Sequence, residues 1–220
     1  MNKNKAAEAL YQKALDIAEN ICAEVKWAYV NHEILISADK EDTSKKFIDT
    51  YAGNVWNVLR RSLLNEVLIS ISKVIVDKKN NPSSFHALHG LLKNPDVLSI
   101  VEANYTQAEE EFQNRVDALL EGLSRLDEYL KSHDIVKSLQ IHRNNYLVHR
   151  SQKVSSSVRN LQWGDEKTLI EIVSDIIHPM ELLLLNGGNI SNSTRSIYKA
   201  YADNFWDGFQ PNDKNFSFTD

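Results

Sequence analysis

Apolar residues recur every three or four positions along most of this sequence, and this period constrains the fold more than any other feature. The clearest example is an apolar stripe that contains Phe47, Tyr51, Val55, Leu59, Leu63, Val67, Ile71 and Val74. Such spacing places side chains on one face of an α-helix, whereas a half-buried β-strand would alternate. The 220 residues include only seven glycines and four prolines, which leaves few places for tight turns. The sequence therefore predicts an all-α fold.

The same periodicity gives approximate helix boundaries. Long helices are expected over about 4–36, 45–77, 106–130 and 193–209, short helices after 84 and 94, and another helix from 165 that kinks or ends at Pro179. Three aromatic residues near the end of the first helix, Trp27, Tyr29 and His32, are expected in the core rather than at a ligand. Core packing is also favoured over partner docking for the aromatic residues of the last helix, which include Tyr201 and Phe205.

Composition is that of an ordinary soluble globular protein, with 42% hydrophobic and 25% charged residues. One domain is expected over residues 1–209, with a flexible tail over 210–220. No membrane partner is expected, because charged residues interrupt even the most apolar window, 169–185. The amino terminus lacks the apolar core of a signal peptide, and the single cysteine, Cys22, has no partner in the sequence. These features favour a cytoplasmic protein.

The net charge of −5 is unevenly distributed. The helix expected over 106–130 is strongly acidic, whereas residues 131–159 contain six basic residues and one acidic residue. A basic stretch of this kind is suited to a phosphate backbone. The alternative is a solvated basic face that pairs with the acidic helix, and charge alone does not separate the two interpretations.

Residues 141–150 concentrate the groups best suited to phosphodiester chemistry, with two histidines, two arginines and two asparagines and no acidic residue. Imidazole titrates near neutrality, and guanidinium binds phosphate through two hydrogen bonds. Within this stretch, Arg143, Asn144 and His149 are candidate catalytic residues. A second set is expected to bind substrate or to support the site: His142, Asn145, Tyr146 and Arg150.

Two of these supporting residues also have a structural interpretation. Ile135, Leu139, His142, Tyr146 and His149 follow one another in steps of four and three, so His142 and Tyr146 can simply pack in a helical seam. On a straight helix Arg143 and His149 would lie about 120° apart around the axis and about 9 Å apart along it. A bend, or two copies of the motif related by two-fold symmetry, would be needed to bring them together.

Other kinds of chemistry find little support in the sequence. His86 and His89 have a spacing that can bind metal on a helix, but no cysteine or carboxylate in the segment completes a ligand set. There is no phosphate-cradling glycine loop, CxxC pair or Gly-x-Ser-x-Gly motif. Neither a metal nor a cofactor is therefore expected. Arg60 or Arg61 could be a second phosphate contact, although a solvated pair of arginines or an ion pair to a neighbouring helix is favoured.

The motif resembles the signature of the HEPN superfamily, an arginine and a polar residue followed by a histidine after four to six intervening residues. Arg143, Asn144 and His149 match it with five residues intervening. The apolar helix from Trp56 to Asp77, followed by residues 81–85, resembles the abortive-infection (AbiU-like) branch. This resemblance implies an antiparallel helical bundle with additional short and C-terminal helices, and a homodimer whose cleft is lined by the motif of both protomers.

The resemblance implies a metal-independent endoribonuclease of the toxin–antitoxin or phage-defence type, with RNA as its partner. His149 would be the general base or acid, Arg143 would stabilise charge on the phosphoryl oxygens, and Asn144 would position the phosphate. The alternative is a non-catalytic module that binds nucleotides or RNA or recruits another protein. Some HEPN toxins carry a tyrosine, two residues after the histidine, that a cognate antitoxin modifies. Here that position is Ser151, which favours a different inhibitor or none.

Overall fold

Every element in the described part of the chain is a helix, as the periodicity predicted. The computed structural model describes residues 3–47, 50, 52–76, 84–106, 109–132, 135–147, 161, 164–187 and 190–208. The helices are α1 (Lys3–Ala38), α2 (Glu41–Phe47), α3 (Ala52–Ile75), α4 (Phe85–Leu92), α5 (Pro95–Asn104), α6 (Glu109–Ser132), α7 (Ile135–Leu147), α8 (Asp165–Leu184) and α9 (Ile190–Gly208). The tail expected over 210–220 lies outside the described residues.

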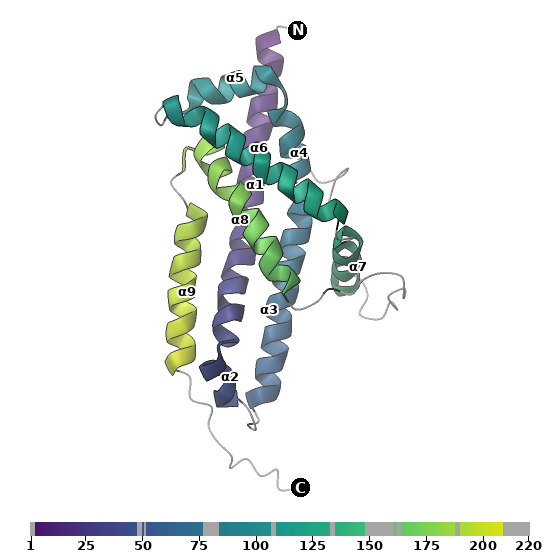
Figure 1. Ribbon diagram of the computed structural model, residues 1–220, viewed down its shortest axis with the longest axis vertical. Helices are drawn as coiled ribbons and strands as arrows, with labels where there is room; N and C mark the ends of the chain where they lie inside the picture. Colours follow the sequence, from purple (N-terminus) through teal and green to yellow (C-terminus); the bar gives the residue numbers. More distant parts are fainter. Residues whose placement is uncertain are drawn as a thin grey trace.

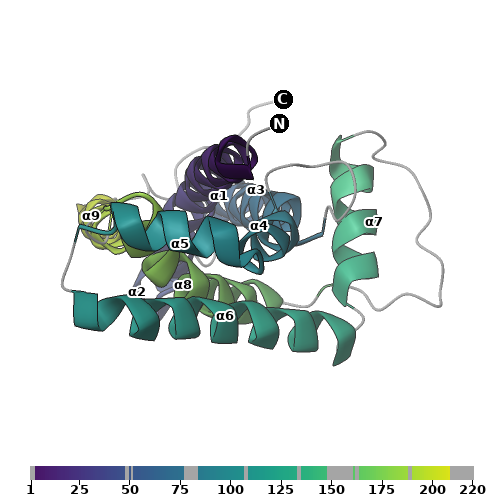
Figure 2. The ribbon, with the colours of Figure 1, turned by 90° about the horizontal axis from the view of Figure 1, so that it is seen from above.

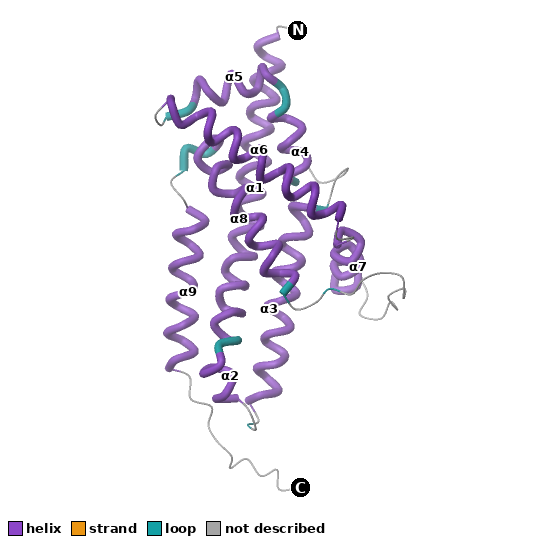
Figure 3. The backbone as a smooth tube through the Cα atoms, viewed as in Figure 1, coloured by secondary structure: helices purple, strands orange, loops and turns teal. Residues whose placement is uncertain are grey.

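Helix α1 is the axis of the bundle. Its apolar stripe, which includes Ile17, Ile21, Val25 and Ala28, is almost completely buried. Helices α3 and α9 flank α1, and α6 and α8 cross in front of it as a second layer (Figure 1). The backbone trace shows the three long helices α1, α3 and α9 running along the long axis of the molecule (Figure 3). A continuous apolar core therefore joins helices that are distant in sequence.

The single helix expected over 45–77 is two helices, α2 and α3. The end of α2 and the start of α3 lie so close together that a Cβ atom on Gly53 would lie 2.8 Å from the carbonyl oxygen of Phe47. Phe47 then stacks on Trp56, with ring centroids 5.6 Å apart, and packs edge-on against Trp206 of α9. This small aromatic cluster fixes α2 and the start of α3 at one end of the bundle.

Polar side chains cap the two short helices α4 and α5 at their amino termini. The hydroxyl of Ser84 accepts a hydrogen bond from the backbone N–H of Ala87 and caps α4. Asn94 caps α5 in the same way, with Pro95 at the first helical position. These caps satisfy backbone donors that the first turn of a helix leaves unpaired.

Helix α8 continues through Pro179 to Leu184 and is buried along most of its length. It packs closely on α6, because a Cβ atom on Gly122 would lie only 2.9 Å from Cγ1 of Ile176. Among the helices of the described residues, none has a stretch that is both long and apolar enough to cross a membrane.

Candidate active site

The helix that carries the predicted motif, α7, lies at the edge of the bundle. Seen from above, it crosses the side of α3 and stands apart from the other helices (Figure 2). Ile135 and Leu139 anchor it, since both are completely or almost completely buried. Lys137 and Gln140 on its other faces are exposed. The helix is therefore held by one apolar face and leaves Lys137 and Gln140 accessible to solvent.

His142 continues the anchoring stripe and is partly buried. Its Nε2 atom is buried and has no hydrogen-bond partner among the residues that the structure describes. Burial lowers the pKa of His142 below its ordinary value of 6.5, because the charged imidazolium is disfavoured away from water. The imidazole is therefore neutral near pH 7, as a proton acceptor must be.

Arg143, the next residue, is also partly exposed on α7. Asn144, Asn145 and Tyr146 belong to the same helix, but the structure does not describe their side chains. His149 and Arg150 lie outside the described residues. The structure thus places His142 and Arg143 side by side on one helix, while the pairing of Arg143 with His149 stays a prediction.

The amino-terminal half of α3 exposes apolar side chains that the sequence placed on a buried stripe. Of that stripe, Val55 is 70% exposed and Leu59 37%, whereas Leu63 and Val67 further along α3 are buried. Val58, which is not part of the stripe, is 66% exposed. The predicted stripe is therefore correct for the second half of α3 and wrong for the first. In Figure 1 this exposed half of α3 extends below α7.

Arg60 has a structural role, as its favoured interpretation predicted. Its guanidinium forms an ion pair with Asp39 at the end of α1 and lies 4.3 Å from the ring centroid of Trp56. Arg61 is exposed on α3. Of the two arginines, only Arg61 is thus placed where it could meet a phosphate from solvent.

The two histidines of α4 do not form a metal centre with other described side chains. His89 lines a concavity of about 500 Å³ between α4 and α6, together with Lys93, Asp127 and Lys131. In the parts of the chain that the structure describes, no group of three histidine, cysteine, aspartate or glutamate side chains is placed to hold a metal ion.

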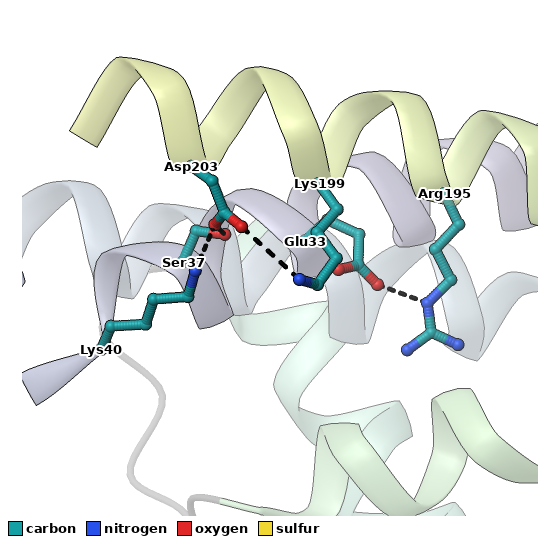
Figure 4. Close-up of polar contacts among 6 residues, drawn as sticks. All are labelled: Glu33, Ser37, Lys40, Arg195, Lys199 and Asp203. Carbon is teal, nitrogen blue, oxygen red and sulfur yellow. Dashed lines mark hydrogen bonds and ion pairs between the residues drawn. The ribbon is translucent and has the colours of Figure 1, made fainter. Parts of the chain in front are cut away.

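Sequence reasoning did not find a polar cluster between α1 and α9. The Arg195 guanidinium of α9 pairs with the buried carboxylate of Glu33, and Asp203 accepts hydrogen bonds from Ser37 and from Lys40 at 2.6 Å (Figure 4). Spacing within one helix gives no signal for such pairs, because the partners are about 160 residues apart in sequence.

Two expectations about aromatic residues are partly wrong. Tyr29 and His32 are buried as predicted, and the Tyr29 hydroxyl lies 2.8 Å from the hydroxyl of Ser174. Trp27, however, is 62% exposed. On α9, Trp206 packs in the core, whereas Ile197, Tyr201 and Phe205 point to solvent.

Comparison with known proteins agrees with this architecture. A family model, HEPN_AbiU2, with the description AbiU2, matches residues 11–205, which include α7 and the whole predicted motif. No curated protein matches, and no solved structure does. Because the family model covers most of the sequence, the chain belongs to the AbiU2 family, an abortive-infection branch of the HEPN superfamily.

Proposed function

We propose that this chain is a metal-independent endoribonuclease of the phage-defence type, active as a homodimer in the cytoplasm. The observation that carries the proposal is the position of Arg143 and His142, on an edge helix of a HEPN-family bundle that one apolar face anchors. An active site that acts on a polymeric substrate needs a rigid supporting element and polar side chains that solvent and substrate can reach.

The proposed reaction is attack of a ribose 2′-hydroxyl on the adjacent phosphorus atom. The bond from the 2′-oxygen to phosphorus forms, the bond from phosphorus to the 5′-oxygen breaks, and the products are a 2′,3′-cyclic phosphate and a free 5′-hydroxyl. His149 transfers a proton, Arg143 stabilises the charge that develops on the phosphoryl oxygens, and Asn144 holds the phosphate. Asn145, Tyr146 and Arg150 would contact neighbouring parts of the RNA.

Local charge supports an RNA substrate at α7 and argues against one at α6. Helix α7 contains no acidic residue, and its Lys137 is exposed. Helix α6 instead exposes Glu111, Asp117 and Glu121 to solvent. A polyanion would therefore be attracted to α7 and repelled by α6.

The exposed half of α3 supports a homodimer. Val55, Val58 and Leu59 are spaced i, i+3 and i+4 and so lie on one face of the helix. A contiguous exposed apolar patch of this kind commonly marks an interaction site. If a second copy covers this face through a two-fold axis, the two copies of α7 approach each other, because α7 packs on the side of the same helix.

The test is an RNA-cleavage assay with purified protein, total RNA and transfer RNA in excess chelator. We expect cleavage products that end in a 2′,3′-cyclic phosphate. The variants Arg143→Ala and His149→Ala should each slow cleavage by ~100-fold or more, the usual loss when an acid–base or charge-stabilising group is removed. His86→Ala is the matched control, since His86 is an exposed histidine of α4 and does not belong to the motif.

Two results would overturn the proposal. One is binding of RNA without any cleavage by the wild-type protein, which would indicate a binding or adaptor module instead. The other is unchanged cleavage by His149→Ala, which would move the chemistry to another site.

A further inference from the structure

Helix α9 exposes a stripe of large apolar side chains, here called the outer stripe, that consists of Ile197, Tyr201 and Phe205. These residues are 50%, 64% and 57% exposed. They are spaced four apart, so they lie along one side of the helix. Asn204 and Gly208, three residues after Tyr201 and Phe205, are also exposed and are uncharged. An ordinary surface helix has the opposite arrangement, with its apolar face on the core and its charged face in water.

Three charged residues of α9 lie on the side that faces α1 (Figure 4). Arg195 pairs with Glu33 of α1, Lys40 donates a hydrogen bond to Asp203, and the Lys199 nitrogen lies 3.5 Å from Asp203. The outer stripe follows this charged set by two positions, which is about 200° around the helix. The outer stripe is therefore both exposed and free of charge.

The absence of charge limits what can cover the outer stripe. Nucleic acid binds through basic residues that neutralise its phosphates. A helix that lies on an anionic membrane uses lysine and arginine side chains beside its apolar face. The two basic residues of α9, Arg195 and Lys199, instead lie close to Glu33 and Asp203. An uncharged stripe with anchors four residues apart suits the apolar face of another helix.

The exposed area is too small for a second copy to be a stable occupant. A fully buried aromatic side chain covers 150–250 Å², so the exposed parts of the three side chains amount to roughly 300 Å². Two rigid copies that met through this stripe would bury roughly 600 Å² in total, whereas a stable interface buries about 1,200 Å² or more. A separate helical segment, only about 10 Å wide, can lie along the stripe and also contact the surface beside it.

Two ring contacts hold the outer stripe in a fixed conformation. Tyr201 packs edge-on against Tyr198, with ring centroids 6.0 Å apart. Phe205 packs in the same way against Trp206, at 4.9 Å, and Trp206 is buried against Phe47. Rings that are already oriented lose little conformational entropy on binding, so they are suited to anchor a partner.

We propose that the outer stripe of α9 binds an amphipathic helix of a different protein. The apolar side chains of that helix, spaced by three and four residues, pack around Ile197, Tyr201 and Phe205, and its contacting face carries no charge. Helix α9 flanks α1 on the side away from α3 (Figure 1). The partner therefore does not compete with a second copy on α3, and its binding goes beyond the proposed nuclease function.

The test uses the full chain with photo-reactive p-benzoylphenylalanine in place of Tyr201, produced in the organism that encodes the protein. Irradiation should give one discrete product with another protein, and mass spectrometry identifies the cross-linked segment. A synthetic peptide of that segment should become helical when it binds the purified wild-type protein, as circular dichroism measures. The same photo-reactive residue in place of Val58, which is 66% exposed on α3, is the control and should not capture that protein.

Tyr201→Asp should weaken binding of the peptide by about 30-fold or more, because a tyrosine anchor contributes strongly to an interface of this kind. Lys199→Ala should bind the peptide as the wild-type protein does, because Lys199 lies on the side of α9 that carries Asp203. Fluorescence anisotropy measures both dissociation constants. An unchanged melting temperature of Tyr201→Asp shows that the loss is not a folding defect.

Several outcomes would overturn the inference. One is the absence of any product from position 201. A product that contains two copies of this chain would assign the stripe to self-association, and a cross-link to residues 209–220 would assign it to the chain itself. A cross-link to lipid would assign it to a membrane surface. A captured segment that binds Tyr201→Asp equally well, or that binds without becoming helical, would also contradict the proposal.

Discussion

Glu33 of α1 and Arg195 of α9 form an ion pair whose carboxylate is almost completely shielded from solvent. The Glu33 side chain is 1% exposed and that of Arg195 32%. The guanidinium also lies 5.6 Å from the ring centroid of Tyr29. Because α9 has few buried apolar residues, this pair is a main attachment between α9 and the rest of the bundle.

Removal of Arg195 should therefore destabilise the fold. Arg195→Ala leaves the buried Glu33 carboxylate without its counter-ion, and we expect the free energy of unfolding to fall by roughly 3 kcal/mol. Urea denaturation measures the change. Lys199→Ala is the control, since Lys199 is 53% exposed and its nitrogen lies 3.5 Å from Asp203, a geometry worth about 0.5 kcal/mol or less. An equal decrease in the free energy of unfolding of the two variants would contradict a larger stabilising contribution from the Glu33–Arg195 pair.

The contact between α6 and α8 depends on the missing side chain of Gly122. In Gly122→Ala, the new Cβ atom would meet the buried Ile176 at 2.9 Å, so we expect a net loss of about 1–2 kcal/mol despite the better helix propensity of alanine. Gly90→Ala on α4 is the control, because a Cβ atom there has no neighbour within 4 Å. That variant should gain about 0.5–1 kcal/mol. Stabilisation by both substitutions would show that the helices can separate without penalty.

Buried His32 should make the protein sensitive to mild acid. Burial, followed by the positive charges of Arg195 and Lys167, lowers the pKa of His32 from 6.5 to about 4. The unfolded state therefore binds more protons than the folded state between these values, and the free energy of unfolding decreases as the pH falls. The expected loss from this group is roughly 2 kcal/mol at pH 5 and 3 kcal/mol at pH 4, relative to pH 7.

Urea denaturation at pH 7, 6 and 5 tests this prediction. His32→Leu removes the titrating group, so its stability should change less with pH over this range than that of the wild-type protein. Asp203, whose pKa is lowered to about 2 by its hydrogen bonds from Lys40 and Ser37, contributes only in more acidic solution and does not confuse the result. Parallel curves for the two proteins would disprove the assignment to His32.

If the exposed face of α3 forms the dimer interface, a substitution on α3 should disrupt the dimer and an equivalent substitution on α9 should not. Val58→Asp places a charge on the exposed face of α3 and should convert dimers to monomers and reduce RNA cleavage. Tyr201→Asp on α9 is the matched control, because Tyr201 and Val58 are 64% and 66% exposed. Sedimentation equilibrium gives the mass of each variant. A monomeric wild-type protein, or dissociation by Tyr201→Asp alone, would exclude the α3 face as the interface.

Local sequence patterns determined much of the fold. The helical period of the apolar residues and the small number of turn residues predicted the all-α architecture. Helix α4 begins after Ser84 because the Ser84 hydroxyl accepts a hydrogen bond from a backbone N–H of the first helical turn. The arginine and histidine spacing around Arg143 pointed to the HEPN superfamily, which the family model over residues 11–205 confirms. The apolar period, the cap and the motif spacing can all be recognised from residues that are close together in sequence.

Only the tertiary structure decided which apolar faces are covered. Leu63 and Val55 belong to the same stripe of α3, yet one is buried and the other is 70% exposed. Periodicity reports that a helix has an apolar face, but the partner that covers it comes from segments distant in sequence. The same limit applies to Glu33 and Arg195, which meet because α9 returns alongside α1. Sequence thus determined the helices, their caps and the family, while long-range packing decided burial, ion pairing and the exposed position of α7.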